Sequence, residues 1–294
     1  MKILVAGENG QVATELRIQG QSSPHEVITL GRNGLDISDA DQVEQQIKAV
    51  QPDIVINAAA YTAVDKAEEE VELAYAINRD GPGYLAESCK LQGIPLLQIS
   101  TDYVFDGCKD SPYAESDKVS PLGVYGQSKW AGEEAVRSGI DQHIIMRTSW
   151  VFSRHGHNFV KTMLRVGAER NELKVVDDQL GGPTSANGIA SALLALCNQY
   201  EAQGRLAWGT YHYSGQPFTS WHGFAEQIIE RGRKHGLINH EVKVRPIPTH
   251  EYPTPAKRPA NSRLLSNCFS AAFGIEADDW EAQLEKIVAA LAAG

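Results

Sequence analysis

The chain has 294 residues, of which 27 are Lys or Arg and 37 are Asp or Glu, so its formal net charge at pH 7 is −10. Hydrophobic residues make up 42 % and charged residues 22 %, which is typical of globular proteins and excludes a disordered or fibrous chain. The length accommodates one large α/β domain or two unequal domains. The negative net charge argues against partners such as nucleic acid or an anionic membrane surface, because both require clustered Lys and Arg.

The four cysteines are widely separated and form no C-x-x-C pair, so neither a zinc site nor a redox dithiol is supported. The apolar run at the N-terminus is too short for an export signal, and no stretch approaches the ~20 apolar residues that cross a bilayer. We therefore expect a cytoplasmic protein with reduced thiols.

Short apolar runs alternate with helical patterns through the first half of the chain. Strands are predicted at 3–6, 27–30, 53–57, 95–100 and 144–148, and helices at 12–18, 39–50 and 71–92. This alternation predicts an α/β fold, a Rossmann-type doubly wound parallel sheet. After about residue 150 turn-rich pieces appear, with helices expected at 186–200, 220–235 and 279–292. We expect a dinucleotide-binding domain at 1–150, on which the helix at 186–200 packs, and a smaller α/β substrate lobe at 151–294.

A glycine loop follows the first predicted strand and opens the first helix. Its spacing is G-x-x-G-x-x-A rather than the commoner G-x-G-x-x-G. Glycine permits the tight turn and lets the backbone approach a pyrophosphate, which then binds to the helix N-terminus. The loop by itself is a weak signal, and a plain strand–helix turn is the alternative. The predicted cofactor contacts in the loop are Gly7, Asn9, Gly10, Gln11 and Val12.

The second predicted strand ends in Leu30-Gly31-Arg32, where many NAD-binding proteins carry a carboxylate. A guanidinium suits a 2′-phosphate, so Arg32 predicts NADPH as the preferred cofactor, with NADH as an alternative. The competing interpretation is that Arg32 is a solvated loop residue. Asp36 and Ile37 follow at a place where the adenine could make contact.

The most specific local pattern is Tyr125-x-x-x-Lys129. On a helix these two positions share a face, and an ammonium beside a phenol is expected to lower the pKa of the phenol, making Tyr125 a usable general acid. Thr101, at the end of the fourth predicted strand, could hydrogen-bond a reacting carbonyl. Small residues end the third strand and leave room for a cofactor, namely Ala58, Ala59 and Ala60.

Further motifs occur in a fixed order along nearly the whole chain. They lie at 57–68, 100–105, 124–126 with Lys129, 147–151, 158–163, 178–179, 182–184, 252–256, 258–259 and 261–264. With these motifs the chain resembles the extended short-chain dehydrogenases/reductases and, more narrowly, the dTDP-4-dehydrorhamnose reductase family. The resemblance implies NADPH-dependent reduction of the C4 ketone of a dTDP-4-keto-6-deoxyhexose. It implies that Tyr125 is the proton donor, that Lys129 binds the nicotinamide ribose of the cofactor and tunes Tyr125, and that Thr101 completes the triad.

The resemblance also implies substrate contacts and an assembly. The implied substrate residues are Thr101, Asp102, Tyr103 and Trp150, with Arg258 and Asn261 from the second-lobe motif, and the implied assembly is a homodimer. Some members hold Mg²⁺ on acidic side chains that include a Glu after a Pro-Thr pair. This chain keeps Glu15 but has Asn187 there. An amide is a weaker ligand for a hard cation than a carboxylate, so we expect no metal.

Two rival hypotheses stay open at this point. A related 4-ketoreductase could deliver hydride to the other face of the sugar and give a product of different stereochemistry. A noncatalytic NADP-binding regulatory subunit, similar to the β subunit of methionine adenosyltransferase, could also carry these motifs. The retained Thr101, Tyr125 and Lys129 favour an enzyme.

Overall fold

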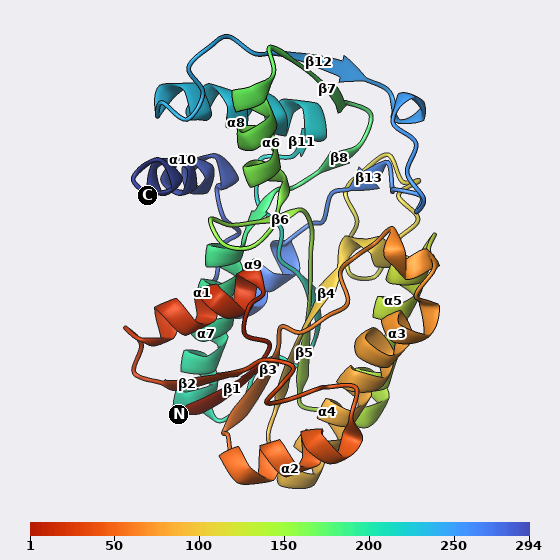
Figure 1. Ribbon diagram of the computed structural model, residues 1–294. Coiled ribbons are helices and arrows are strands. Elements are labelled where there is room, and N and C mark those ends of the chain that lie inside the picture. Colours follow the sequence, from red (N-terminus) through yellow and green to blue (C-terminus); the bar gives the residue numbers. More distant parts are fainter.

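The computed structural model describes residues 1–294 and contains one central sheet of six parallel strands (Figure 1). Their order across the sheet is β10-β5-β4-β3-β1-β2. The strands are β1 (Lys2–Ala6), β2 (Glu26–Leu30), β3 (Ile54–Asn57), β4 (Leu96–Thr101), β5 (His143–Thr148) and β10 (Gly209–His212). The chain forms β2 on one side of β1 and then crosses to form β3 on the other side of β1. The direction of winding therefore reverses between β1 and β3. Ligands bind at such a switch point, outside the carboxyl ends of the strands.

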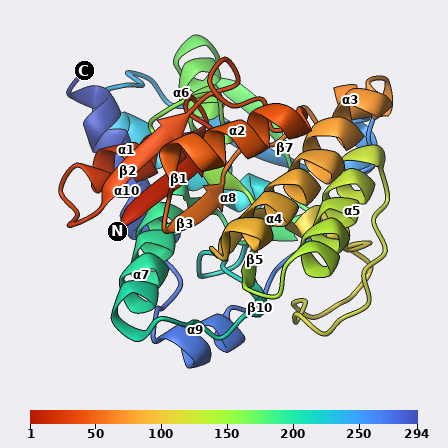
Figure 2. The same ribbon diagram turned by 90° about the horizontal axis from the view of Figure 1, so that it is seen from below.

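Helices cover both faces of this sheet (Figure 2). Alternate residues of one strand enter different cores, because successive side chains point to opposite faces. Ile3 and Val5 pack with α1 (Gln11–Gly20), α7 (Ala186–Gln203) and α9 (Asn267–Phe273), whereas Leu4 and Ala6 belong to the core of the opposite face. Covering that opposite face are α2 (Ala40–Val50), α4 (Gly81–Gln92) and α5 (Val124–Gly139). The predicted doubly wound α/β fold is confirmed.

The helix predicted over 71–92 is interrupted. It consists of α3 (Val71–Tyr75), a π-helical turn (Ala76–Asp80) and α4. Asn78 in this turn accepts a hydrogen bond from the Tyr61 backbone N–H and donates to the Tyr61 carbonyl and the Ser128 hydroxyl. The turn therefore ties the loop after β3 to α5. The apolar periodicity alone did not indicate this interruption, because the distant partners of Asn78 stabilise it.

The second half of the chain contributes three elements to the sheet region, namely α7, β10 and α9. The α7 helix packs on α1, and β10 pairs with the edge strand β5, in register from Gly209 opposite Ile144 to His212 opposite Arg147. The sequence did not predict β10, since its four residues include a glycine and a histidine and lack a continuous apolar run. The predicted domain boundary near residue 150 stays a prediction. Three elements that follow residue 150 belong to the sheet region: β10 is a strand of the sheet, and α7 and α9 pack against it.

The remaining elements form a lobe above the carboxyl ends of the strands (Figure 1). It is built from α6 (Phe159–Glu169), β7 (Glu172–Val176), α8 (Trp221–Lys234), β12 (Lys243–Ile247) and α10 (Trp280–Ala292), which enclose a separate apolar core. Short strands connect it to the sheet region: β6 (Val151–Phe152), β8 (Leu180–Gly181), β9 (Thr184–Ser185), β11 (Thr219–Ser220) and β13 (Asn261–Ser262). Three 3₁₀ turns complete the fold: η1 (Lys66–Glu68), η3 (Asp102–Val104) and η4 (Thr249–Glu251).

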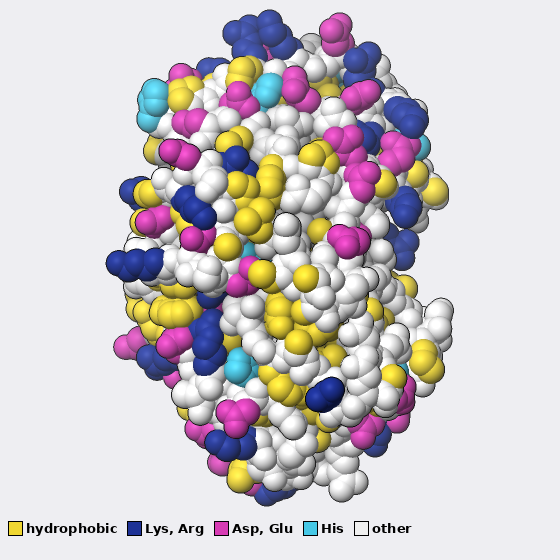
Figure 3. Space-filling model, turned by 180° about the vertical axis from the view of Figure 1, so that it is seen from behind, with side chains coloured by type: hydrophobic (Ala, Val, Ile, Leu, Met, Phe, Trp, Pro, Cys, Tyr) yellow, Lys and Arg dark blue, Asp and Glu magenta, His cyan; other side chains and the backbone are white.

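The surface carries both signs of charge. On the face shown in Figure 3, Lys and Arg side chains are scattered among Asp and Glu rather than gathered in one patch. None of the helices combines the length and apolar character that a membrane crossing requires.

We predict that Leu193→Ala in α7 destabilises the whole protein by about 2–5 kcal/mol, because a fully buried leucine leaves a cavity behind. Leu193 is 0 % exposed in the core between α7 and the sheet. Urea unfolding followed by circular dichroism measures the loss. Leu91→Ala is the matched control, since Leu91 is 76 % exposed. Equal midpoints for the two variants would contradict a structural role of α7 in the sheet core.

Candidate active site

A cavity of about 510 Å³ lies at the carboxyl ends of the strands, and we call it the sheet-edge cavity. It brings together segments that follow β1, β3, β4 and β5 with the first turns of α5. The predicted site residues that line it are Asn9, Gly10, Gln11, Val12, Ala58, Ala59, Ala60, Thr101, Asp102, Tyr103, Tyr125, Lys129 and Trp150. Most of the residues singled out for cofactor, catalysis and substrate therefore face one space.

The glycine loop has the geometry of a phosphate cradle. Gly7 has φ +117°, and a Cβ there would lie 3.3 Å from the backbone of Ala58 and Ala59, so only glycine fits between β1 and β3. Gly10 caps α1 with extended backbone and no side-chain hydrogen bond, and a Cβ on it would meet nothing within 4 Å. The first N–H groups of α1 thus remain available to an anion, as a dinucleotide pyrophosphate requires.

The loop at 153–158 lies against the glycine loop. The Asn158 side chain donates to Gln11 Oε1 at 2.9 Å, and Gln11 Nε2 donates to the Val151 carbonyl at 3.5 Å. Gly156 and His157 from this loop also line the sheet-edge cavity. The start of the second half of the chain therefore forms part of the cofactor side of the cavity.

The approach of α5 to η3 places Tyr125 in the cavity. A Cβ on Gly126 would lie 2.2 Å from the Tyr103 carbonyl oxygen, so the first turn of α5 can come this close only with glycine. The rings of Tyr103 and Tyr125 meet edge to face, with centroids 5.3 Å apart and planes at 76°. Lys129 follows one helical turn later on the same face, and its Nζ donates to the Ile99 carbonyl at 2.8 Å.

Burial, rather than Lys129, dominates the acidity of Tyr125. Desolvation raises the pKa of the phenol above its usual value, and the Thr101 hydroxyl beside it opposes this increase. The expectation that Lys129 lowers this pKa is wrong for the structure, in which the ammonium bonds to a β4 carbonyl instead. Burial lowers the pKa of Lys129 itself to about 8, with Glu133 acting in the opposite direction. Tyr125 therefore holds its proton at neutral pH.

Asp102 adds a buried carboxyl group next to this pair. Its side chain accepts a hydrogen bond from the Thr101 hydroxyl at 3.1 Å through Oδ1, whereas Oδ2 is buried without a partner. Burial raises the pKa of Asp102 to about 6, and the hydroxyls of Ser262 and Thr101 oppose the increase. An unpartnered buried acceptor at a cavity wall is suited to a ligand hydroxyl.

A second cavity of about 310 Å³ adjoins the first, and we call it the lobe cavity. Tyr103 lines both cavities. Trp150 has φ +49° and stacks on Trp221 of the lobe cavity at 3.6 Å between ring centroids. Arg258 lines the lobe cavity and pairs with Asp65 at 2.6 Å, while its Nη1 is buried without a partner. Tyr103 is thus a wall common to both cavities, and the stack of Trp150 on Trp221 joins their linings.

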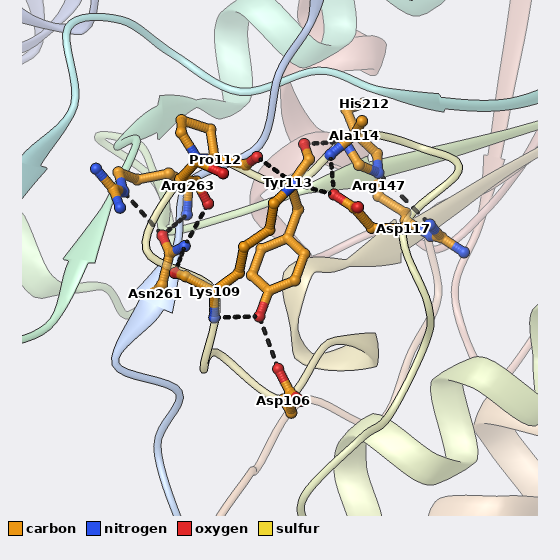
Figure 4. A network of polar contacts seen from close by, with 11 residues as sticks. Asp106, Lys109, Pro112, Tyr113, Ala114, Asp117, Arg147, His212, Asn261 and Arg263 are labelled. Carbon is orange, nitrogen blue, oxygen red and sulfur yellow. Dashed lines mark hydrogen bonds and ion pairs between the residues drawn. The ribbon is translucent and has the colours of Figure 1, made fainter.

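Five predicted residues line neither cavity, namely Gly7, Arg32, Asp36, Ile37 and Asn261. Arg32 has a 68 % exposed side chain at the end of β2, and its Nε donates to Asp36 Oδ2 at 3.0 Å. Ile37 is 4 % exposed in the core beneath α2 and α4, so any cofactor contact there would use its backbone. Asn261 makes all its side-chain hydrogen bonds within the protein, to the carbonyls of Lys109 and Ser111 and from Arg263 (Figure 4).

A buried ion pair anchors the helix that carries Tyr125 and Lys129. Glu133 on α5 accepts from Arg147 of β5 at 2.9 and 2.7 Å and from the Ser100 hydroxyl of β4 at 2.6 Å. Both charged side chains are at most 2 % exposed. Arg147 also approaches His212 of β10, whose Nδ1 lies 3.2 Å from the Tyr113 carbonyl (Figure 4). This arrangement fixes α5 against β4 and β5.

Glu15 and Asn187 are the residues at which the resemblance would place a metal site. Glu15 accepts a hydrogen bond from the Asn187 amide at 3.1 Å and another from the Ser153 hydroxyl at 3.4 Å. His155 Nε2 lies 3.6 Å away. The structure contains no group of three or more His, Cys, Asp or Glu side chains able to hold a metal ion.

Sequence reasoning missed several residues that line the cavities. Phe159, Met163, Gln179, Tyr252 and Thr254 lie within the motifs that carry the resemblance, but no role was assigned to them. No local pattern marked Trp221, which reaches the site only because α8 packs over Trp150. Asp65 lay in the motif after β3, and its partner Arg258 lies 193 positions further along the chain.

The doubly wound sheet, the glycine loop and the Thr101, Tyr125 and Lys129 set in one cavity define an oxidoreductase of the extended short-chain dehydrogenase/reductase class. Residues 1–293 match the family described as the RmlD substrate binding domain. The chain is 44 % identical to the dTDP-4-dehydrorhamnose reductase of Sinorhizobium fredii, with 99 % of this chain and 98 % of the relative covered. Its identity to the Escherichia coli K12 enzyme of that name is 39 %, covering 98 % and 97 %. The chain therefore belongs to the dTDP-4-dehydrorhamnose reductase family.

Solved structures of that family have the same fold. The dTDP-4-dehydrorhamnose reductase of Clostridium acetobutylicum superposes with a TM-score of 0.91 at 39 % identity, covering 99 % of each chain. The Bacillus anthracis enzyme, crystallised in complex with NADP, superposes with a TM-score of 0.89 at 36 % identity, covering 97 % of this chain and 98 % of that one.

We predict that Glu133→Gln lowers the free energy of unfolding by about 3–5 kcal/mol, because removing one partner leaves the buried Arg147 charge uncompensated. Chemical denaturation measures the change. Glu134→Gln removes the neighbouring carboxylate, which is 55 % exposed and pairs only at the surface, so it serves as control. Equal stability of the two variants would contradict an anchoring role of Glu133.

The depressed pKa of Lys129 predicts a pH dependence of stability. The pKa of Lys129 is about 8 in the folded protein and ordinarily 10.5. Between these two pH values the unfolded chain binds more protons at this position than the folded chain. The wild type should therefore gain stability relative to Lys129→Met as pH rises through this window. Denaturation at several pH values measures the difference. Lys90→Met, which removes an exposed lysine from α4, should show no such gain.

Proposed function

We propose that this protein reduces the C4 ketone of dTDP-4-dehydro-L-rhamnose to dTDP-L-rhamnose with NADPH. The observation that carries the proposal is that Thr101, Tyr125 and Lys129 line the same cavity as the glycine loop. Full-length relatives at 37–44 % identity bear the name of this reductase, which supports the substrate. NADPH when bound supplies the hydride, and NADH is the alternative donor.

The glycine loop and the N-terminus of α1 bind the pyrophosphate of the cofactor in this proposal. Gly7 lets the backbone come close, and Gly10 leaves the helix N–H groups accessible. The small side chains of Ala58, Ala59 and Ala60 leave space along the end of β3. Lys129, which donates to the Ile99 carbonyl, is the one Lys or Arg that lines the sheet-edge cavity, and it orients the nicotinamide ribose.

Tyr125 donates the proton that the reduced carbonyl oxygen requires. Its phenol lies half-buried at the cavity wall and is protonated at neutral pH, so it can give its proton to the more basic alkoxide that forms on reduction. The Thr101 hydroxyl lies beside the phenol and can hydrogen-bond the same oxygen. Asp102, with its free Oδ2, is placed to accept a hydrogen bond from a sugar hydroxyl.

The nucleotide part of the substrate extends into the lobe cavity. Arg258 offers an unpartnered guanidinium nitrogen to a diphosphate, and the stacked Trp150 and Trp221 offer an apolar wall. Asn261 acts indirectly in this arrangement, since it holds the loop at 109–111 rather than a ligand. Tyr103, common to both cavities, separates the sugar from the nucleotide.

We further propose that the enzyme works in the cytoplasm. All four cysteines are free thiols in the structure, which suits a reducing compartment. A homodimer stays a prediction that only the resemblance implies, and the absence of a bound metal also stays a prediction.

We predict that Tyr125→Phe lowers kcat by about 10²–10⁴-fold, the range for loss of a general acid, while the Kd for NADPH stays nearly unchanged. NADPH oxidation with dTDP-4-dehydro-L-rhamnose and fluorescence titration of the cofactor measure the two quantities. Tyr211→Phe removes a phenol of β10 that bonds the Ala207 carbonyl, and it should keep normal turnover.

Near-normal kcat in Tyr125→Phe would overturn the assignment of the proton donor. NMR of the product tests the stereochemistry at C4, and a product epimeric at C4 would show a related ketoreductase instead. Cofactor binding without any sugar reduction would indicate a noncatalytic subunit.

A further inference from the structure

The side chain of Glu8 lies across the end of β2. The Gly7 N–H donates to the Leu30 carbonyl at 2.8 Å, which holds the glycine loop against that strand end. A Cβ built on Gly31 would lie 2.5 Å from Glu8 Oε2 and 3.5 Å from its Cδ. The Glu8 carboxylate thus occupies the space into which a side chain at position 31 would project.

This place has a defined chemistry in doubly wound folds. A carboxylate at the end of the second strand accepts hydrogen bonds from the adenosine ribose hydroxyls, whereas an Arg there accommodates a 2′-phosphate. Here the strand end itself offers Gly31 and Arg32, a pattern that favours NADPH. The structure supplies the carboxylate from a different element, the glycine loop, and places it at the same position.

The charges around this point do not neutralise Glu8. Arg32, which directly follows Gly31, directs its Nε to Asp36 rather than to Glu8. Asp36 is also bonded by the Ser38 hydroxyl and backbone N–H. Glu8 forms no ion pair and is exposed. A 2′-phosphate here would face two carboxylates and one guanidinium, whereas a 2′-hydroxyl would find a free acceptor.

We propose that Glu8 is a cofactor-specificity residue, which hydrogen-bonds the ribose hydroxyls of NADH and weakens the binding of the 2′-phosphate of NADPH, so that the chain accepts both cofactors. Arg32 acts in the opposite direction. The inference rests on the proposed function only in taking a nicotinamide dinucleotide as the cofactor. Glu8 and Arg32 together then determine the choice between NADH and NADPH.

The test is the ratio of the Kd values for NADPH and NADH, measured by fluorescence titration without any sugar. Glu8→Gln should lower the Kd for NADPH by about 10-fold, which corresponds to about 1.4 kcal/mol, because it removes a repulsion between exposed charges. The Kd for NADH should change much less, since the amide keeps an oxygen acceptor. The gain for NADPH should shrink at high salt.

Glu26→Gln is the matched control. It removes an equal charge from the exposed first residue of β2, at the far end of the same strand, and should leave the ratio unchanged. Arg32→Ala should raise the Kd for NADPH selectively. Equal ratios in Glu8→Gln and Glu26→Gln would overturn the proposal while leaving the proposed reduction intact. A wild type that binds neither dinucleotide would overturn the proposed function and this inference together.

Discussion

The buried ion pair between Glu133 and Arg147 is the constraint on which the site depends. It joins α5 to β5, and the Ser100 hydroxyl adds β4. Two charges taken out of water require close pairing, so α5 has little freedom to slide or rotate on the sheet. Tyr125 and Lys129 lie on the two preceding turns of the same helix. Their position relative to Thr101 at the end of β4 is therefore fixed by an interaction outside the cavity.

Local devices, rather than net charge, equip the site for anionic ligands. The chain carries a formal charge of −10, yet its proposed cofactor and substrate are both anions. Backbone N–H groups at the N-terminus of α1, Lys129 and Arg258 supply the favourable potential where it is needed. The role proposed for Glu8 is the converse, in which a single carboxylate lying across the end of β2 acts against one cofactor.

The two halves of the chain build the site together. The first half contributes the glycine loop and the Tyr125-Lys129 helix, and the second contributes the loop at 153–158, Trp221 and Arg258. The second half also contributes β10, α7 and α9 to the sheet. A substrate that reaches from one cavity into the other therefore contacts segments whose relative position depends on the packing of both halves.

The sequence by itself determined the features that local patterns encode. Apolar runs predicted five of the six central strands, glycine spacing predicted the cofactor loop, and the Tyr125-x-x-x-Lys129 spacing predicted a shared helix face. Only the tertiary structure decided that Glu8 covers Gly31 and that Trp221 stacks on Trp150. It also decided that Asn261 makes its side-chain hydrogen bonds within the protein and that burial raises the pKa of Tyr125. The reason is physical: desolvation and through-space contacts depend on residues far apart in sequence, and no local pattern records them.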